Sequence, residues 1–586
     1  MTINLRSGLD TGLSVSKDGG SGKDGQPGTA GRPGVDTEQS VTGLSIGQYL
    51  IRRLSDYGIR HVFGLPGDYV LSFYSMLEHS PLDLVNCTRE DCAGFAADAY
   101  ARVNGMGAVC VTYGVGGLSL ANSIAGAYAE KSPVILISGA PGLRERINNP
   151  LLHHRVREWH TQLDVFEKIC AASREIIDPA TAFRDIDQLL DTADRLKRPV
   201  YIELPRDMVA VVPDQIRPYH ATKARSDQSA LAEAVKEAVG RIERAEKPVI
   251  IAGVELHRYG LQAEVVALAE TAGIGIASTM LAKSVVSEVH PLYIGLYEGA
   301  LGRDEVTKFV EESDCVILLG TLLTDLDLGI FTAKLDATKS IYATADELQI
   351  SHHHFHNVLL EDFLKALVAA KPRAAKRALP LGPAAAQGEF VLAPDKPITT
   401  TRLVRRLDQS LDDKTIVIAD VGDALFASSE LMIRGQTEFL SPAYYTSMGF
   451  AVPAALGAKV ARPDLKVVAL VGDGAFQMTG MELSTIVRRK LAVTVIVLDN
   501  KGYGTERVIL EGSFNDINPW EYQLLPQVLG GGTGYEVRTE GEFDAAISKA
   551  LADTSGLSLI RVHIGLEDRS ITLDRIGKGL AGRMRS

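Results

Sequence analysis

The residues with the clearest chemistry are Gly472-Asp473-Gly474 and, 27 residues after Asp473, Asn500 in the run Asp499-Asn500-Lys501-Gly502. Each motif follows a short β-branched run (467–471 and 493–498) that reads as a buried parallel strand. Strands of this kind end at one edge of the sheet, where ligands bind. Asp473, Asn500 and the Gly502 carbonyl would offer three oxygen ligands that suit Mg²⁺, with diphosphate oxygens and a water completing its shell. Gly-Asp-Gly alone would be only a turn, so the spacing to Asn500 carries this prediction.

Two further groups could do acid–base chemistry. Glu90 precedes the Ala-rich run 93–101, which we expect to form a buried helix, and a carboxylate at the mouth of such a helix needs a partner. The alternative is an exposed Arg–Glu pair. His153 and His154 follow an Asn/Pro-containing loop, where histidines are commonly exposed, and an adjacent pair is poorly spaced for zinc.

The elements that would position these groups alternate between helix and strand along most of the chain. Besides the two runs above, we expect buried strands at 109–112, 134–138, 200–203, 249–252, 315–319 and 415–419. The fold class is therefore α/β, with doubly wound parallel sheets.

Composition shifts divide the 586 residues into segments. A glycine recurs at every third position from Gly19 to Gly34, and a disordered Gly-rich arm is expected there rather than a triple helix. The predicted segments are this arm (1–40), a first domain (41–212), a middle domain (229–370), an Ala/Pro-rich linker (371–397), a third domain (398–565) and a C-terminal tail (566–586).

A weak internal repeat links the first and third domains. In both, a strand runs into Gly-x-Gly, a helix follows, and the next strand begins about 20 residues later. We therefore expect the two domains to share a topology. Val115 stands where the third domain has Asp473, so only the third domain can bind a cation at this point.

Charge and composition exclude several classes of protein. The formal net charge is −12, which argues against a nucleic-acid-binding protein. No apolar run approaches the ~18 residues of a membrane helix, and the N-terminus lacks a signal-peptide core. The five cysteines are few and lie among apolar residues, so reduced thiols in a cytoplasmic protein are expected.

On these residues the chain resembles the thiamin-diphosphate-dependent 2-oxo acid decarboxylases, a family that includes pyruvate, indolepyruvate and phenylpyruvate decarboxylases. The Gly-Asp-Gly…Asn pair is that family's cofactor motif, and the likeness covers residues 41–565. It is carried also by Phe63–Asp68, Arg89–Arg102, Leu151–His154, Asp420–Phe426 and Gly502–Glu506.

The resemblance implies three domains. The first would bind the pyrimidine of the cofactor, the second would be a Rossmann-like middle domain, and the third would bind the diphosphate. It implies that Glu90 hydrogen-bonds N1′ of the cofactor. It implies that four side chains hold the substrate carboxylate, protonate the enamine and help to release the aldehyde: Asp68, His153, His154 and Glu506. Thr446 would offer its carbonyl to the cofactor's amino group, and Met448 would be the apolar wedge beneath it. The implied cofactor-binding set is Glu90, Gly422, Asp423, Thr446, Met448, Asp473, Gly474, Ala475 and Asn500, with Asp473, Asn500 and Gly502 as metal ligands.

The resemblance also bears on substrate and assembly. Gly504 and Thr505 stand where pyruvate-specific relatives carry larger residues, whereas Leu425 replaces a smaller one. We expect an arylpyruvate or a long or branched 2-oxo acid, decarboxylated to an aldehyde. The family's active site joins domains of different subunits, so a homodimer or a dimer-of-dimers homotetramer is expected.

Two rival functions and two negative expectations complete the prediction. The rivals are a carboligase of the acetohydroxyacid synthase type and a non-catalytic protein of the same fold. The middle domain shows no Gly-x-Gly-x-x-Gly, so no FAD or NAD is expected. The run His352–His356 looks like a metal site but is not expected to be one.

Overall fold

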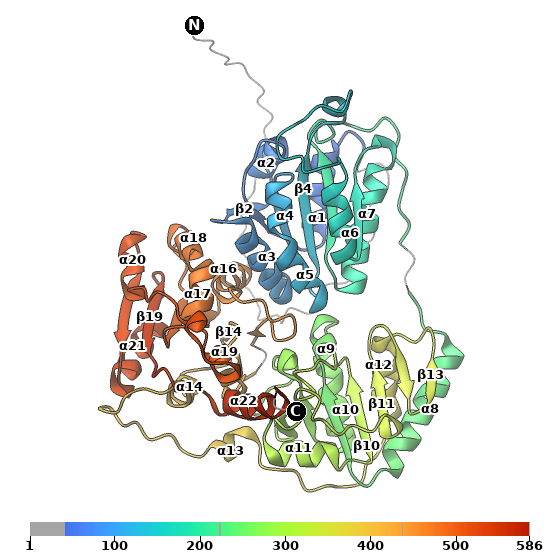
Figure 1. Cartoon of the computed structure of the whole chain (residues 1–586). Coiled ribbons are helices and arrows are strands. Elements are labelled where there is room, and N and C mark those ends of the chain that lie inside the picture. The colour runs from blue at the N-terminus through green and yellow to red at the C-terminus, as the bar shows by residue number, and fades with distance from the viewer. Residues whose placement is uncertain (1–40, 222–223, 436, 585–586) are drawn as a thin grey trace, which may run out of the picture. The chain divides into compact units, whose positions relative to one another are not determined.

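The computed structural model describes residues 41–221, 224–435 and 437–584. The Gly-rich arm predicted at 1–40 lies outside the described residues. Three separate sheets, each flanked by helices, make up the described chain (Figure 1). The predicted α/β class with three sheet domains is confirmed.

The first sheet has six parallel strands in the order β2-β1-β3-β4-β6-β5. Its strands are β1 (His61–Gly64), β2 (Asp83–Asn86), β3 (Gly107–Val111), β4 (Val134–Ala140), β5 (Ala172–Glu175) and β6 (Val200–Pro205). Its principal helices are α1 (Ile46–Asp56), α2 (Leu71–Glu78), α3 (Glu90–Asn104), α4 (Val115–Ser119), α5 (Ala121–Ala129), α6 (Thr161–Ile169) and α7 (Pro179–Leu196).

The third sheet repeats this order as β15-β14-β16-β17-β19-β18, again all parallel. Its strands are β14 (Thr415–Ala419), β15 (Phe439–Leu440), β16 (Lys466–Gly472), β17 (Thr494–Asp499), β18 (Thr533–Val537) and β19 (Ser558–His563). Its helices include α14 (Thr400–Asp408), α15 (Asp423–Ala427), α16 (Ala451–Ala461), α17 (Asp473–Thr479), α18 (Leu483–Arg488), α19 (Gly504–Ile509) and α21 (Glu540–Ala552). The shared topology predicted from the Gly-x-Gly repeat is confirmed.

The middle sheet has seven strands in the order β13-β12-β11-β10-β7-β8-β9, of which β12 and β13 run antiparallel at one edge. They are β7 (Pro248–Ala252), β8 (Ile276–Ser278), β9 (Tyr293–Leu296), β10 (Cys315–Leu319), β11 (Ser340–Ala343), β12 (Leu348–Ile350) and β13 (His353–Phe355). Its helices are α8 (Gln228–Arg244), α9 (Val254–Arg258), α10 (Gln262–Ala272), α11 (Asp304–Glu311) and α12 (Leu360–Ala370).

Helix α3 is buried because it packs closely on α16. A Cβ added at Gly457 in α16 would lie 2.0 Å from the Ala96 carbonyl oxygen, so only glycine permits this approach. Apolar residues of both helices belong to one core cluster. This packing explains the Ala-rich composition of α3 and holds Glu90 at its first turn.

The segment after residue 565 is not a simple tail. It forms α22 (Ile571–Met584), which packs on α15 and α19 (Figure 1). The sequence did not predict this helix, because glycines stand at positions 577, 579 and 582 and glycine disfavours helix. The linker 371–397 likewise contains a short helix, α13 (Pro383–Gln387).

All five cysteines are free thiols, and four are buried, as predicted. Within the described ranges, no helix has the length and apolarity to cross a membrane.

Candidate active site

Asp473 lies where β16 ends and α17 begins, as its motif predicts. Its side chain is 1% exposed. Oδ1 accepts the Gly474 N–H at 2.8 Å, and Oδ2 accepts those of Lys501 (2.6 Å) and Gly502 (3.2 Å). These bonds tie the end of β16 to the loop after β17. Burial, and then the charge of neighbouring Asp499, raises the pKa of Asp473 to about 7. A buried carboxylate with a raised pKa is a ligand that a cation would stabilise.

The Asn500 side chain completes a cluster of acceptors. One terminal atom of its amide lies 2.8 Å from the Gly502 carbonyl oxygen and 3.2 Å from Asp473 Oδ1. With its nitrogen on this side, the amide donates to both oxygens. Turned over, the same amide would present its oxygen beside the other two, an arrangement that a cation would stabilise. Neighbouring ligands of an octahedral Mg²⁺ are about 3 Å apart, given its ~2.1 Å bonds. The residues present therefore fit a magnesium ion.

Two glycines shape the loop after β17. Gly502 has φ +150°, and a Cβ there would lie 2.0 Å from the Asn515 carbonyl oxygen. A Cβ at Gly504 would lie 2.6 Å from the Asn500 amide nitrogen. Gly504, predicted to line the substrate pocket, therefore also leaves room for a metal ligand.

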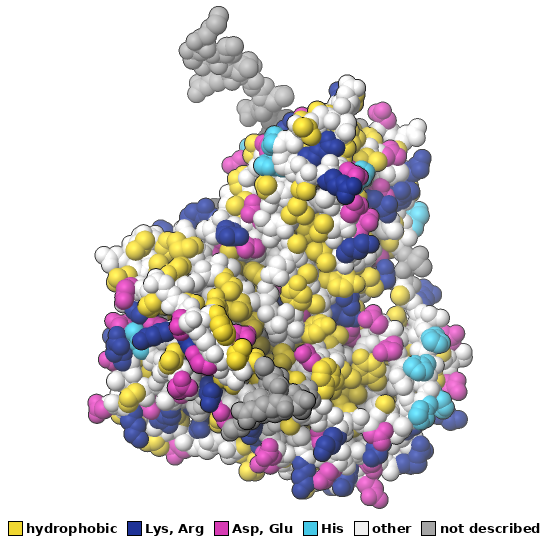
Figure 2. Space-filling model, in the orientation of Figure 1, with side chains coloured by type: hydrophobic (Ala, Val, Ile, Leu, Met, Phe, Trp, Pro, Cys, Tyr) yellow, Lys and Arg dark blue, Asp and Glu magenta, His cyan; other side chains and the backbone are white. Residues whose placement is uncertain are grey.

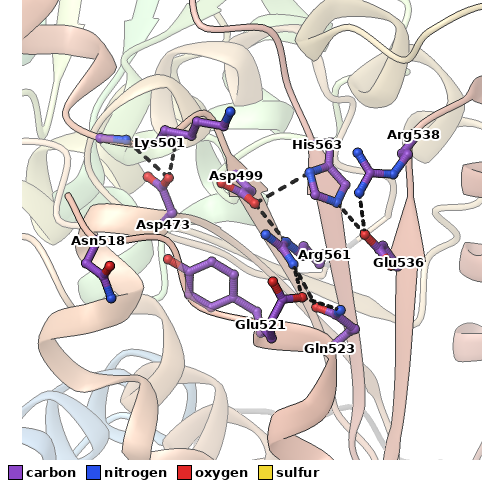
Figure 3. Close-up of polar contacts among 12 residues, drawn as sticks. Asp473, Asp499, Lys501, Asn518, Glu521, Gln523, Glu536, Arg538, Arg561 and His563 are labelled. Carbon is purple, nitrogen blue, oxygen red and sulfur yellow. Dashed lines mark hydrogen bonds and ion pairs between the residues drawn. The ribbon is translucent and has the colours of Figure 1, made fainter. Parts of the chain in front are cut away.

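A charged network lies behind this cluster (Figure 3). Asp499 is 2% exposed, and its Oδ2 accepts Arg561 Nε at 2.7 Å. Arg561 continues to Glu521 at 2.7 Å. His563 lies 3.6 Å from Asp499 and 2.8 Å from Glu536. Arg561 in this network compensates part of the negative charge that Asp499 places beside Asp473.

The loop between β15 and α16 carries Thr446 and Met448. Thr446 has φ +55°, a conformation rare outside glycine, so its carbonyl direction is fixed by unusual backbone geometry. Met448 is partly buried and packs against the main core cluster.

Two buried acids that the sequence analysis did not single out hold this loop. Asp420 accepts the N–H groups of Gly449 (3.0 Å) and Ala451 (2.7 Å), and burial raises its pKa to about 6. Glu130, at the end of α5, accepts those of Tyr444 and Tyr445, both at 2.9 Å. For Asp420 a signal existed, because it directly follows β14 at the carboxyl edge of the sheet. For Glu130 none did, because its partners lie over 300 residues away.

The structure brings Asp68, His153 and His154 together. His153 Nε2 lies 2.7 Å from Asp68 Oδ2, and His154 Nε2 lies 3.9 Å from Oδ1. Tyr69 stacks on the His153 ring at 4.8 Å. All three side chains of the cluster reach solvent. Imidazoles beside a carboxylate suit proton transfer near neutral pH.

Glu90 opens α3, and its carboxylate accepts no hydrogen bond from any described residue. A Cβ at Gly116 would lie 3.6 Å from its Oε1, so the carboxylate faces the Gly-x-Gly turn of the first domain. The preceding Thr88 is bound by Glu482 of the third domain, at 2.9 Å through its N–H. Glu506 is exposed on the first turn of α19.

The predicted residues at the start of α15 differ in burial and in their contacts. Gly422 (φ +105°) precedes the helix, and a Cβ there would lie 3.6 Å from Thr505 Oγ1, a buried oxygen without a partner. The Asp423 carboxylate accepts the Ser570 N–H at 3.0 Å, so it anchors the segment leading into α22. Leu425 is 1% exposed. Gly474 and Ala475 are buried in the first turn of α17.

The predicted acid–base residues and the predicted metal ligands do not contact one another directly within the described chain. No hydrogen bond or ion pair among the described residues joins the Asp68–His153–His154 cluster, Glu90 or Glu506 to the oxygen cluster around Asp473.

The histidine run of the middle domain behaves as a surface feature. His353 Nδ1 pairs with Glu237 at 2.8 Å, and β13 lies at the sheet edge. Figure 2 shows histidine side chains exposed over this edge. Among the described residues, the only group of three or more His, Cys, Asp or Glu placed to hold a metal is Asp68, His153 and His154.

Comparison with known proteins matches all three parts of the chain to thiamine pyrophosphate enzyme models. The N-terminal TPP binding domain matches residues 44–165, the central domain 235–370 and the C-terminal TPP binding domain 420–562. An indole-3-pyruvate decarboxylase of Azospirillum brasilense is 35% identical over 92% of this chain and 98% of its own length. A probable pyruvate decarboxylase of Schizosaccharomyces pombe is 32% identical (93% and 98%). An alpha-keto-acid decarboxylase of Mycolicibacterium paratuberculosis is also 32% identical (88% and 93%).

Proposed function

The chain belongs to the thiamine pyrophosphate enzymes and is a 2-oxo acid decarboxylase, and we propose that its substrates are arylpyruvates or long or branched aliphatic 2-oxo acids. The bound cofactor supplies the nucleophilic carbon and the electron sink that such decarboxylations need. The observation that supports cofactor binding is the convergence of the Asp473 carboxylate, the Asn500 side-chain amide and the Gly502 carbonyl at strand ends within the match to the C-terminal TPP binding domain.

The metal is proposed to be Mg²⁺. It would be held by Asp473, Asn500 and the Gly502 carbonyl, and it would anchor the diphosphate at the N-terminus of α17. The Thr446 carbonyl and Met448 would orient the cofactor, because Asp420 and Glu130 fix the loop that carries them.

In this proposal the remaining acids and histidines move protons. Glu90, whose carboxylate accepts no hydrogen bond from a described residue, would hydrogen-bond the cofactor ring. Asp68, His153, His154 and Glu506 would bind the substrate carboxylate and deliver the proton that completes the aldehyde.

We also propose that two chains complete each site, as at least a homodimer and as a dimer of dimers in the larger form. Within the described chain Asp68, His153 and His154 make no hydrogen bond or ion pair to the cluster around Asp473, which leaves each cluster free to meet a second chain. Exposed apolar side chains beside each cluster also support this: Leu151 is 96% exposed near His153, and Met478 and Met481 are 46% and 47% exposed beyond Asp473. The cytoplasmic location expected from the cysteines stays a prediction.

The substrate proposal rests on small residues at α19. Gly504 and Thr505 are small, and Thr505 Oγ1 faces Gly422, which directly precedes the helix that carries Leu425. The test is a panel of pyruvate, 2-oxoisocaproate and phenylpyruvate, assayed for CO₂ and aldehyde with thiamin diphosphate and Mg²⁺. We expect the highest kcat/KM for the larger acids. A preference for pyruvate would contradict the substrate proposal, and ketol products in place of aldehydes would indicate a carboligase.

A further inference from the structure

A buried chain of hydrogen bonds lies behind the Gly-x-Gly turn of the first domain. Gln162, in the first turn of α6, is 2% exposed, and Tyr201 and Glu203 on β6 are both fully buried. Side chains two residues apart on a strand point to the same face, so the tyrosine and the glutamate lie together on one face of β6. Burying polar groups of this size is costly unless they are hydrogen-bonded to one another.

Both ends of the Gln162 amide are hydrogen-bonded. Its Oε1 accepts the N–H of Gly114 at 2.7 Å, and its Nε2 donates to the hydroxyls of Tyr201 (2.6 Å) and Ser138 (2.9 Å). Tyr201 in turn donates to Glu203 Oε2 at 2.5 Å. Because a backbone N–H can only donate, the amide has one possible orientation. A buried network of this kind holds the backbone that it contacts in one arrangement.

The turn that Gln162 holds contacts two of the predicted site residues. A Cβ at Gly114 would lie 2.2 Å from the His154 carbonyl oxygen, so the turn packs directly on the His154 backbone. His154 itself has φ +66°, a left-handed conformation that persists outside glycine only where neighbouring structure holds it. On the other side of the turn, a Cβ at Gly116 would lie 3.6 Å from Glu90 Oε1. A shift of the turn would therefore move His154 and change the surroundings of Glu90.

We propose that Gln162 and Tyr201 are positioning residues, which act on the reaction through the turn at Gly114. This turn orients His154 and Glu90, two of the groups that the proposed function uses on the substrate and the cofactor. The inference rests on that proposed function and adds to it two residues that act at a distance. Misplacing a reacting group by about 1 Å can slow a reaction about 100-fold, so breaking the chain should slow the chemical step.

The first experiment breaks the chain at two points. Tyr201→Phe removes one hydroxyl group and keeps the ring that stacks on Phe166 at 4.7 Å. We expect its kcat for decarboxylation to fall roughly 10-fold or more, with KM within about threefold of wild type. Gln162→Leu removes the link to Gly114 itself and should lower kcat at least as far. If Gln162→Leu does not fold, Tyr201→Phe carries the test alone.

Tyr49→Phe is the matched control in the same domain. Tyr49, on α1, is 5% exposed, stacks on Phe183 at 3.8 Å and donates its hydroxyl to Asp187 Oδ2 at 2.7 Å, but it belongs to a different core cluster from Tyr201. Both variants lose a buried bond from tyrosine to carboxylate, so thermal unfolding should show a loss of stability in both. Only Tyr201→Phe should lose kcat. The same kcat in the two variants, lowered or not, would overturn the inference.

A double variant tests whether the two residues act in series. If Tyr201 acts only through Gln162, Gln162→Leu combined with Tyr201→Phe should have the kcat of Gln162→Leu alone within about twofold, whereas independent effects would multiply. Multiplied effects would overturn the chain. Wild-type protein that releases no CO₂ from any 2-oxo acid would count against the proposed function, whereas active wild type with unchanged kcat in both folded single variants would overturn only this inference.

Discussion

Arg561 Nε donates to Asp499 Oδ2 at 2.7 Å, between neighbouring strands β19 and β17 and directly behind the proposed metal ligands (Figure 3). Their side chains are 7% and 1% exposed. Breaking a buried pair by removing one partner leaves an uncompensated charge, which costs far more than losing an exposed pair. The pair therefore bears on both the stability of the third domain and its metal site.

Arg561→Met should lower the free energy of unfolding by about 3–5 kcal/mol without metal. Adding Mg²⁺ and thiamin diphosphate should raise the free energy of unfolding of Arg561→Met by more than it raises that of wild type. The reason is that the cation would neutralise Asp499 as well as Asp473. Chemical denaturation with and without the additions measures both effects. Arg538→Met is the control: Arg538 is 61% exposed in its pair with Glu536, so its loss should cost under about 1 kcal/mol. Equal losses in the two variants would contradict the argument.

Glu90→Gln should reduce the decarboxylation rate at least ~10²-fold, within the range that acid–base groups contribute. Glutamine has nearly the same shape, and no described residue bonds the Glu90 carboxylate, so folding and cofactor binding should persist. Activity measures the first effect, and cofactor-dependent thermal stabilisation measures the second. Near-wild-type turnover would remove Glu90 from the mechanism.

Mixing two inactive variants should restore activity if two chains build each site. Glu90→Gln and Asp473→Ala chains, dissociated together and reassembled, would form some sites with both native residues. Up to about a quarter of wild-type activity is expected if chains reassort at random and sites act independently, because mixed dimers are half of the population and one of their two sites is intact. Each variant treated alone is the control. A fully active monomer by light scattering would contradict shared sites.

How far the sequence predicts this protein depends on the range of the contacts involved. The strand ends that carry Asp473 and Asn500 were predictable, because periodicity and motif spacing are local. The shared topology of the outer domains followed from one repeated Gly-x-Gly turn. Helix α22 was missed because its stability comes from packing on α15 and α19 rather than from its own glycine-containing sequence. Glu130 was missed because the N–H groups that it accepts belong to residues more than 300 positions away.

A buried acid in the first domain should make stability depend on pH. Glu203 is fully buried within β6, and burial raises its pKa to about 8 although Tyr201 donates to it. The folded state therefore keeps a proton that the unfolded state releases above pH ~4.5. The free energy of unfolding should fall as the pH rises from about 4.5 to 8, by about 1.4 kcal/mol per pH unit from this group alone. Glu203→Gln removes the titration, so urea unfolding at several pH values should show a flatter profile for this variant. Identical slopes would contradict the assignment.

Filling the substrate pocket should change which acid is preferred. Thr505 Oγ1 is buried without a partner and faces Gly422, so Thr505→Ile loses no hydrogen bond to a described residue and adds apolar volume beside the proposed substrate position. Phenylpyruvate needs that volume and pyruvate does not. One or two extra carbons in a pocket are worth about 1–3 kcal/mol of discrimination, so the ratio of kcat/KM for phenylpyruvate over pyruvate should fall roughly 10- to 100-fold. Thr505→Val is the matched control, because it keeps the size of threonine while removing the hydroxyl group, and its ratio should stay close to that of wild type. An equal fall with both variants would assign the effect to the hydroxyl group, and no fall with Thr505→Ile would place the side chain of the substrate elsewhere.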